Sequence, residues 1–417
     1  MRRLFIINDS LSNKISFYII AAFLVALPFD RFFSEWLLIV FCVHTAIHFR
    51  MEKLRELKNP SVWIAGSVFL LALLGLGYSD YRNQGLNIAL QQIAILLFPV
   101  FLSVSGLHLA SYKWQLLEIF GLTCVVTVLY LYFDAFRVIR YFHLPLASIV
   151  KKQFINQGFT KPIGLHATYF SMYVVLAVCI FIVLLLANNV RRSYIRVFCL
   201  IVLLIGLLQS SSRASLVAAA TTIIFLVPLL LLRGKRRTVF FVVALVTVSF
   251  TMATVTQIGV FRKRLIDDLG NDLSEYRDPG DLTESRMARW KLEWQVILKS
   301  PFMGYGSGSE EDVLKGAYFQ NKFYRSYLLG LNSHSQFLSF LLNQGLIGLL
   351  TYLYLFYYGG RIALLRKDFL LLAFLLLLFI VSLSENILDV SKGVLFFAFF
   401  LPFFLLSDSG SDFVKST

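Results

Sequence analysis

The sequence predicts an all-α polytopic membrane protein with about twelve transmembrane helices and one large external loop subdomain. Of its 417 residues, 58% are hydrophobic and only 15% are charged, whereas soluble domains carry about 25% charged residues. Several apolar runs, such as 165–187, 215–232 and 332–358, reach the roughly 20 residues that a helix needs to cross a bilayer. Such runs span membranes as helices, because a helix satisfies its backbone hydrogen bonds internally.

Hydrophobic periodicity and the intervening turn signals place the membrane helices in order along the chain. Arg2 and Arg3 precede the first apolar stretch, but no small-residue cleavage site follows them. We therefore interpret this stretch as a retained first helix and not as a signal peptide. The ranges 33–49 and 195–210 are short for a membrane span. The predicted helices are 15–29, 33–49, 61–77, 86–107, 114–138, 165–187, 195–210, 213–232, 237–257, 333–358, 368–385 and 391–406.

The distribution of basic residues predicts the orientation of these helices. The loops "HFRMEKLRELKN", "NNVRRSYIR", "RGKRR" and "GGRIALLRKD" are rich in Lys and Arg and fall in alternate gaps. The positive-inside rule then places both termini in the cytoplasm. One loop breaks the pattern, because Lys151, Lys152 and Lys161 lie in a gap assigned to the outside. These lysines form either a functional cluster or an interfacial set that binds lipid headgroups.

The formal net charge of +15 is explained by basic residues that flank membrane helices and meet anionic lipid. No basic stretch interleaves with aromatic residues, so the sequence gives no reason to expect nucleic-acid binding. The cysteines form no C-x-x-C pair and all lie in apolar segments, where they are expected to pack as small hydrophobes. They are Cys42, Cys124, Cys179 and Cys199.

The longest polar segment, 258–332, is predicted to lie outside the membrane as an ordered subdomain. It is much longer than a connection between two helices requires, and long loops often carry function. The chain therefore divides into residues 1–257, with helices one to nine, the loop subdomain 258–332, and residues 333–417, with the last three helices and a cytoplasmic tail.

The stretch "LLQSSSRASLV" places Arg213 at the external junction of two helices, directly after three serines. An arginine at this position needs water or an anion. The start of the following helix presents backbone N–H groups, and the serine hydroxyls add further donors. The pattern is typical of a phosphate site, although an arginine that snorkels to the interface has the same sequence.

A second group of basic residues lies on a predicted helix in the large loop, which Asp281 or Thr283 would cap and Pro301 would end. Arg286 and Arg289 are three residues apart and share a helix face. Arginine suits a diphosphate because its planar guanidinium group binds phosphate oxygens bidentately. Trp290 and Trp294 form an adjoining stripe suited to the headgroup layer. The alternative is an ordinary amphipathic helix with Arg289 paired to Glu293.

His334, in "NSHSQF", begins the apolar run that follows the large loop. Histidine exchanges protons near neutral pH, so His334 is a candidate base for an attacking hydroxyl; the alternative is a polar residue at a helix start. Glu385 lies between the last two helices, where it could orient a histidine or pair with an arginine. His166 and Tyr169 begin another helix on the same side and could line a shared cleft.

Other catalytic patterns are absent from the sequence. It contains no H-E-x-x-H, no D-x-D metal pair and no G-x-S-x-G elbow, so no metal site is predicted. We interpret Asp267, Asp268 and Asp272 as a solvated loop face. "GYGSGS" is interpreted as a flexible turn, since it lacks the G-K-[ST] of a nucleotide-binding loop.

Taken in order, these motifs resemble the O-antigen ligase and polymerase superfamily. The resemblance covers roughly residues 160–400 and is strongest over 209–350. It rests on a helix that opens with Ser-Arg, on the arginines and tryptophans before "SPFMGYGSG", and on a histidine before "FLSFLLNQGLIGLL". The family usually has asparagine after this histidine, and Ser335 stands there in this sequence.

The resemblance implies a membrane glycosyltransferase that takes a glycan from an undecaprenyl-diphosphate-linked donor and acts at the periplasmic face of the bacterial inner membrane. The family's essential arginines map onto Arg213 and onto Arg286 or Arg289, and its histidine maps onto His334. The ligase acceptor is lipid A–core, and the polymerase acceptor is another lipid-linked glycan. Neither a metal nor a cofactor is implied. His166, Tyr169, Lys161, Trp290 and Glu385 are further candidates for substrate contact.

Three functions remain to be distinguished. The basic outer loop at 151–161 and the large loop in the C-terminal third favour an O-antigen ligase, since a phosphate-bearing acceptor suits positive charge. A polymerase of O-antigen or exopolysaccharide needs the same donor site. A lipid-linked oligosaccharide transporter is less consistent with the sequence, because transporters place charges near mid-membrane, and the helix interiors here carry almost none.

Overall fold

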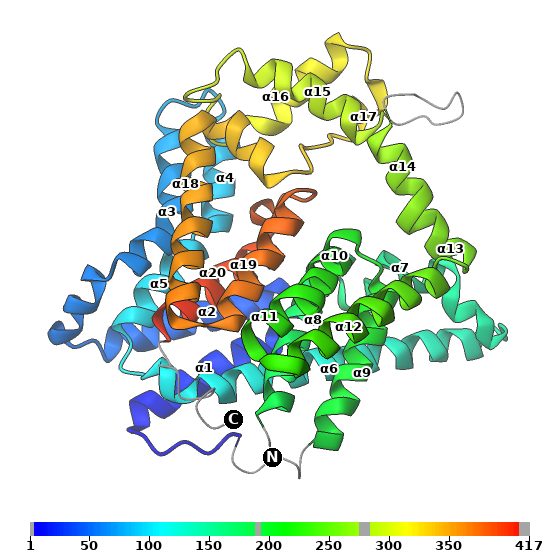
Figure 1. Ribbon diagram of the computed structural model, residues 1–417. Coiled ribbons are helices and arrows are strands. Elements are labelled where there is room, and N and C mark those ends of the chain that lie inside the picture. The colour runs from blue at the N-terminus through cyan, green and yellow to red at the C-terminus, as the bar shows by residue number, and fades with distance from the viewer. Residues whose placement is uncertain (1–3, 188–192, 275–283, 408–417) are drawn as a thin grey trace.

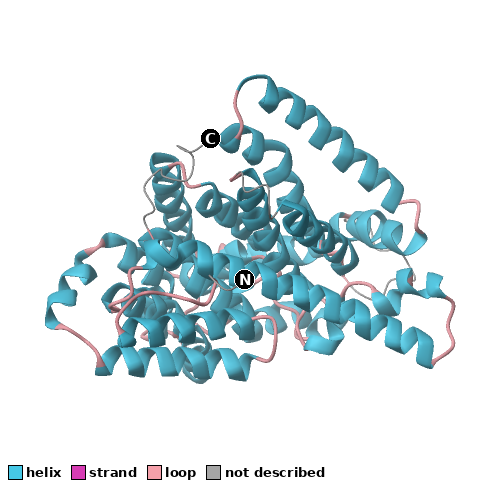
Figure 2. Ribbon diagram, turned by 90° about the horizontal axis from the view of Figure 1, so that it is seen from below, coloured by secondary structure: helices cyan, strands magenta, loops and turns pink. Residues whose placement is uncertain are grey.

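The computed structural model describes residues 4–187, 193–274 and 284–407. These residues form helices joined by loops, and none of them is in a β-strand (Figure 2). The first half contains α1 (Leu11–Ala26), α2 (Arg31–Ile47), α3 (Pro60–Leu76), α4 (Arg82–Gln92), α5 (Ala94–Val104), α6 (Leu109–Tyr141), α7 (Gln157–Thr160), α8 (Ala167–Leu186) and α9 (Ser193–Ser210). The all-helical prediction is confirmed for the described residues.

The second half begins with α10 (Arg213–Thr221), η6 (Thr222–Leu226), α11 (Val227–Leu231) and α12 (Gly234–Val255). The segment after α12 forms α13 (Gly259–Arg262), η7 (Lys263–Asp267), α14 (Asp268–Leu273), α15 (Arg286–Ile297), α16 (Glu310–Gln320) and α17 (Tyr324–Leu328). The chain continues with α18 (Gln336–Arg366), α19 (Phe369–Ser382), η8 (Ile387–Asp389) and α20 (Ser391–Leu406). Each of the predicted helix ranges overlaps one of these helices or a continuous run of them.

The predicted number of twelve membrane-spanning helices is not confirmed. Among the described residues, seven helical stretches are long and apolar enough to cross a membrane, or eight if the bent pair Met51–Lys58 and Pro60–Leu76 is one span. α1, α19 and α20 are shorter apolar helices. At 1.5 Å per residue, the 14 residues of α19 extend about 21 Å, which is less than the roughly 30 Å hydrocarbon core.

The interior of the molecule is built around α8 and α20. In α8, 89% of the most apolar window is buried, and α20 buries a run of phenylalanines that pack on one another and on Phe120 and Phe374. By contrast, only 6% of the corresponding window of α12 is buried. A face this apolar and this exposed requires lipid, which supports a multi-pass membrane protein.

The segment between α12 and α18 arches over one end of the molecule (Figure 1). It has a small hydrophobic core of its own, formed by Leu292, Val296, Ile297, Leu314, Ala317 and Tyr318 together with Leu342 from α18. This core fixes α15 and α16 against the start of α18. α15 is capped by Ser285, whose hydroxyl accepts a hydrogen bond from the backbone N–H of Ala288; the predicted caps Asp281 and Thr283 lie outside the described residues.

The glycine-rich turn after α15 is packed and not flexible, in contrast to the prediction. Residues 306–309 are buried, and the turn inserts into a break in α18 at Gly345, where φ is 63° and ψ is −154°. Leu346 donates its backbone N–H to Pro301, and Gly306 donates to Asn343. A Cβ on Gly345 would lie 2.3 Å from Phe302 backbone atoms. The break therefore requires glycine, both for its positive φ and for close approach.

Candidate functional site

Arg213 and Arg286, which come from different elements, share one carboxylate. Arg213 begins α10 and its Nη2 lies 2.5 Å from Oδ2 of Asp272, at the end of α14. Nε of Arg286, the first residue of α15, lies 3.7 Å from the same oxygen, and its Nη1 donates to the backbone oxygen of Ser384 (3.1 Å). Asp272 therefore holds two guanidinium groups side by side, so it differs from the predicted solvated loop face.

Arg264 of η7 is a third arginine at this position, and the sequence analysis did not single it out. Its Nε donates to the backbone oxygen of Ser211 (3.1 Å), in the serine turn before Arg213. Within the described residues, Arg213 Nη1 and the Ser211 hydroxyl are buried without a hydrogen-bond partner. Buried polar groups are normally paired, so these two donors leave hydrogen-bonding capacity unused beside the arginines.

The electrostatics of the three arginines favour an additional negative charge. Burial, together with the charges of Arg213 and Arg286, lowers the pKa of Arg264 despite the carboxylates of Asp268 and Glu385. Burial and the charges of Arg213 and Arg289 likewise lower the pKa of Arg286 despite Asp272 and Glu385. The neighbouring carboxylates therefore do not fully offset the burial of these arginines and the repulsion between their charges. A bound anion would reduce that repulsion.

Arg289 has a different environment from Arg286. Its side chain is only 6% exposed, and Nη1 points to the backbone oxygen of Asn332 at 3.4 Å. Its charge also acts on the buried Glu293 and Tyr318. Arg289 thus supports the loop before His334 through its contact with Asn332, whereas Arg286 lies close to Arg213 and Arg264.

The backbone before His334 is fixed through Ser333. Trp290 donates its indole N–H to the Ser333 carbonyl oxygen (2.7 Å). The Ser333 N–H donates to Glu310 Oε1 (2.9 Å), and its hydroxyl contacts both Glu293 and Glu310. Trp290 therefore holds this loop through its indole N–H, and Trp294 is 48% exposed.

His334 itself lies just before α18, in a left-handed conformation with φ of 47°. Its backbone N–H donates to the Asn332 side chain (3.2 Å), and Ser335 is the N-cap residue of α18 without a side-chain cap bond. Such backbone conformations are uncommon outside glycine and are maintained by surrounding contacts. The contacts through Ser333 help to supply them.

The His334 ring faces Glu385, with 3.8 Å between Nδ1 and Oε2. The two side chains are 29% and 20% exposed, so the pair is accessible to a ligand. Burial works to raise the pKa of Glu385, but its interactions with His334, Arg286 and His166 outweigh burial and lower it. Glu385 is therefore an anion that can orient the histidine, and it links His334 electrostatically to the arginines.

His166 and Tyr169 lie behind this pair. His166 caps α8 by accepting the Thr168 N–H (3.3 Å), and burial together with the charges of Arg264 and His334 lowers its pKa despite Glu385. Tyr169 is 5% exposed and its hydroxyl donates to the Asn386 backbone oxygen (3.3 Å). Tyr169 thus supports the loop that carries Glu385, whereas His166 interacts electrostatically with Glu385, Arg264 and His334.

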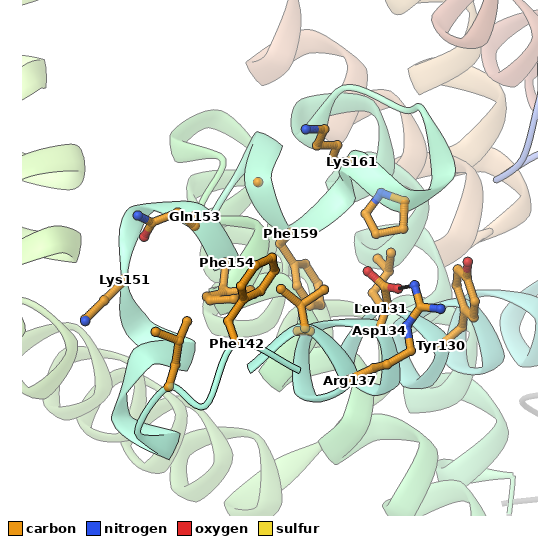
Figure 3. A pocket seen from close by; sticks show the side chains of 15 residues that line it. Tyr130, Leu131, Asp134, Arg137, Phe142, Lys151, Gln153, Phe154, Phe159 and Lys161 are labelled. Carbon is orange, nitrogen blue, oxygen red and sulfur yellow. Dashed lines mark hydrogen bonds and ion pairs between the residues drawn. The ribbon is translucent and has the colours of Figure 1, made fainter. Parts of the chain in front are cut away.

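Lys161 lies apart from the arginines, in the wall of a cavity of about 920 Å³ that Lys151 also lines. Figure 3 shows Phe142, Phe154 and Phe159 gathered in the middle of this cavity, with the two lysines at separate edges. An ion pair between Asp134 and Arg137 (2.6 Å) closes another side. A cavity with aromatic walls and cationic edges suits an amphiphile with a negatively charged headgroup.

Residues 198–353 match the family model described as O-antigen ligase. The match includes Arg213, Arg264, Arg286 and His334. It supports the O-antigen ligase and polymerase superfamily, as the sequence resemblance predicted, and indicates a ligase-like or polymerase function. No curated protein matches the chain.

Proposed function

We propose that this protein is a membrane glycosyltransferase that moves a glycan from undecaprenyl diphosphate to an acceptor hydroxyl at the periplasmic face of the inner membrane. The observation that carries the proposal is the convergence of Arg213, Arg264 and Arg286 beside the pair His334–Glu385. The family match over residues 198–353 supports lipid-linked glycans as the general substrate class.

The three arginines would bind the donor's diphosphate. Guanidinium groups bind phosphate oxygens in a planar fork and remain protonated. The free Nη1 of Arg213 and the Ser211 hydroxyl add donors directed at the same anion. Negative charge grows on the diphosphate as its bond to the sugar breaks, and preorganised donors stabilise such charge by several kcal/mol.

His334 would accept the proton from the attacking hydroxyl. The acceptor oxygen bonds to the anomeric carbon while the bond from that carbon to the diphosphate oxygen breaks. The diphosphate leaves with the bonding electron pair, and the acceptor's proton passes to His334. Glu385, 3.8 Å from Nδ1, stabilises the resulting imidazolium. Attack opposite the leaving group inverts the anomeric centre, and the energy comes from the donor bond without a metal or cofactor.

The acceptor favoured by the structure is lipid A–core, which makes the reaction O-antigen ligation in lipopolysaccharide biosynthesis. The supporting observation is the cavity with Lys151 and Lys161 at its edges, which would hold the phosphate groups of the lipid acceptor apart from the site of transfer, since such groups suit positive charge. A polymerase would instead extend a second lipid-linked glycan.

Reconstitution separates these reactions. The purified protein in proteoliposomes is given an undecaprenyl-diphosphate-linked glycan together with either lipid A–core or a second lipid-linked repeat. The proposal expects a single transfer to lipid A–core and release of undecaprenyl diphosphate. Chain growth on the lipid carrier would identify a polymerase, and movement of the intact donor across the bilayer without transfer would identify a transporter.

A further inference from the structure

A second cavity, of about 550 Å³, lies on another side of His334. Its walls come from α3, α4, α16 and the part of α18 before the break at Gly345, and from Asp389 in η8. His334 lines this cavity, whereas Arg213, Arg264, Arg286 and Glu385 do not. His334 therefore forms a boundary between the arginines and the second cavity.

The chemistry of this cavity differs from that of the arginine cluster. Its walls carry the carboxyl groups of Glu310, Glu311 and Asp389 and several amide side chains, but no lysine or arginine among the described residues. Amides both donate and accept hydrogen bonds, and carboxylates accept them. Such a lining suits a neutral ligand with many hydroxyl groups and disfavours a diphosphate, which the carboxylates would repel.

The amide groups are held in place before any ligand binds. Gln92 donates to the Leu388 backbone oxygen (2.9 Å), Gln336 accepts the Leu388 N–H (2.8 Å), and Gln344 donates to the Ser307 hydroxyl (3.1 Å). Each amide carries two N–H groups and an acceptor oxygen, so one bond fixes its orientation and leaves capacity for a ligand. Fixed polar groups of this kind reduce the entropic cost of binding.

We propose that this cavity binds the sugar unit of the acceptor that carries the attacking hydroxyl. The inference rests on the proposed function. In-line attack requires the acceptor oxygen and the leaving diphosphate on opposite sides of the anomeric carbon. With the diphosphate at the arginines, a sugar in the second cavity presents its hydroxyl to His334 from the other side. The donor glycan's anomeric carbon then lies between the two sites.

Asn87 provides the test residue. It is an exposed residue of α4 that lines the cavity, so Asn87→Trp narrows the cavity from the α4 wall, and the arginines are not part of the lining. Asn83 lies one turn earlier on the same helix, is also exposed and is not part of the lining, which makes Asn83→Trp the matched control. In reconstituted transfer assays we expect Asn87→Trp to raise the acceptor KM about tenfold or more with donor KM unchanged.

A binding measurement separates this inference from the proposed function. Titration calorimetry without donor uses two probes, dephosphorylated core oligosaccharide and a single repeat unit released from its lipid. Wild type and Asn83→Trp should bind one of them about tenfold more tightly than Asn87→Trp. Equal binding by all three proteins, no binding of either probe, or a rise in donor KM for Asn87→Trp would overturn the inference. Binding that depends on Asn87 in a protein that transfers nothing would contradict the proposed function alone.

Discussion

Arg286 and Arg289 are separated by one turn of α15, yet their surroundings differ. Arg286 shares Asp272 with Arg213, whereas Arg289 is buried beneath the loop that ends at His334. Spacing alone could not separate the two, because both lie on one helix face. The structure favours Arg286 as the diphosphate ligand and Arg289 as a supporting residue.

Replacing Arg286 by lysine tests this distinction. Arg286→Lys keeps the charge but removes the planar fork, so we expect the transfer rate to fall about tenfold or more. Arg262→Lys, at an exposed position in the same segment between α12 and α18, is the matched control and should keep the wild-type rate. Initial rates in proteoliposomes make the comparison, and an Arg286→Lys variant as fast as the control would remove Arg286 from the donor site.

Residue type and position predicted Arg213, His334 and Glu385, because each stands out at the end of an apolar run. Arg286 was predicted because it shares a helix face with Arg289 in the large loop. Arg264, Asp272 and Glu310 were not predicted. Arg264 and Asp272 lie in "FRKRLIDDLGND", a charged stretch that reads as a solvated face. Their proximity to Arg213 arises from the path of α13 and α14 over α10, and a tertiary contact of this kind leaves no local signal in the sequence.

The break in α18 joins the segment between α12 and α18 to the apolar helices. Apolar periodicity continues through "LLNQGLIGLL", so the sequence predicted one uninterrupted helix. In the structure, the helix is instead broken at Gly345, where the turn 301–306 inserts. The Tyr305 N–H donates to the Leu342 backbone oxygen, and the Leu346 N–H donates to the Pro301 backbone oxygen. Apolar runs located the helices well. A break whose backbone hydrogen bonds are made by another segment depends on contacts distant in sequence, so the apolar pattern does not show it.

Gly345→Ala should destabilise the protein. The added Cβ would meet the Phe302 backbone at 2.3 Å, and φ is 63° there, a combination that costs about 1–3 kcal/mol or more. Gly360→Ala is the control, since a Cβ at this helical position meets nothing within 4 Å and alanine favours helices. Thermal unfolding in detergent should show a lower Tm for Gly345→Ala only; equal Tm values would show that the break tolerates a side chain.

The buried carboxylates under His334 make stability depend on pH. Burial and the nearby charge of Glu310 raise the pKa of Glu293 from 4.5 to about 8. The folded state therefore holds a proton on Glu293 that the unfolded state releases near pH 4.5, so stability is greatest below that pH and falls as pH rises toward 8. Asp389, with a pKa raised to about 7, acts in the same direction.

Glu293→Gln should reduce this dependence, because glutamine keeps an acceptor for the Ser333 hydroxyl without ionising. We expect the decline in Tm between pH 6 and pH 8.5 to be smaller in the variant than in wild type. Glu311→Gln, at an exposed position on α16, is the control and should follow wild type. An identical pH profile for Glu293→Gln would show that Glu293 is ionised across this range.

At the scale of the whole molecule, the exposed apolar face of α12 and the buried α8 describe a protein immersed in lipid. Composition predicted this environment because a membrane demands long apolar runs. Composition does not fix the number of crossings, since α1, α19 and α20 are apolar yet short. Short apolar helices have the same composition as helices that cross the whole membrane, so composition alone does not separate them.

Cysteine labelling tests the predicted orientation. In a variant whose four native cysteines are replaced by alanine, Lys299→Cys in the segment between α12 and α18 should react with a membrane-impermeant maleimide in intact cells. Lys235→Cys, at the start of α12, should react only after permeabilisation. Both positions are exposed, so the difference reports sidedness. The reverse pattern would place the arginines and His334 in the cytoplasm.

The most direct test of the account is the transfer rate of His334→Ala with a saturating undecaprenyl-diphosphate donor and lipid A–core acceptor. The account predicts that the variant binds donor normally but transfers glycan about 10²- to 10⁴-fold more slowly, because the arginines remain and the base is lost. A folded His334→Ala protein that transfers at the wild-type rate would contradict it.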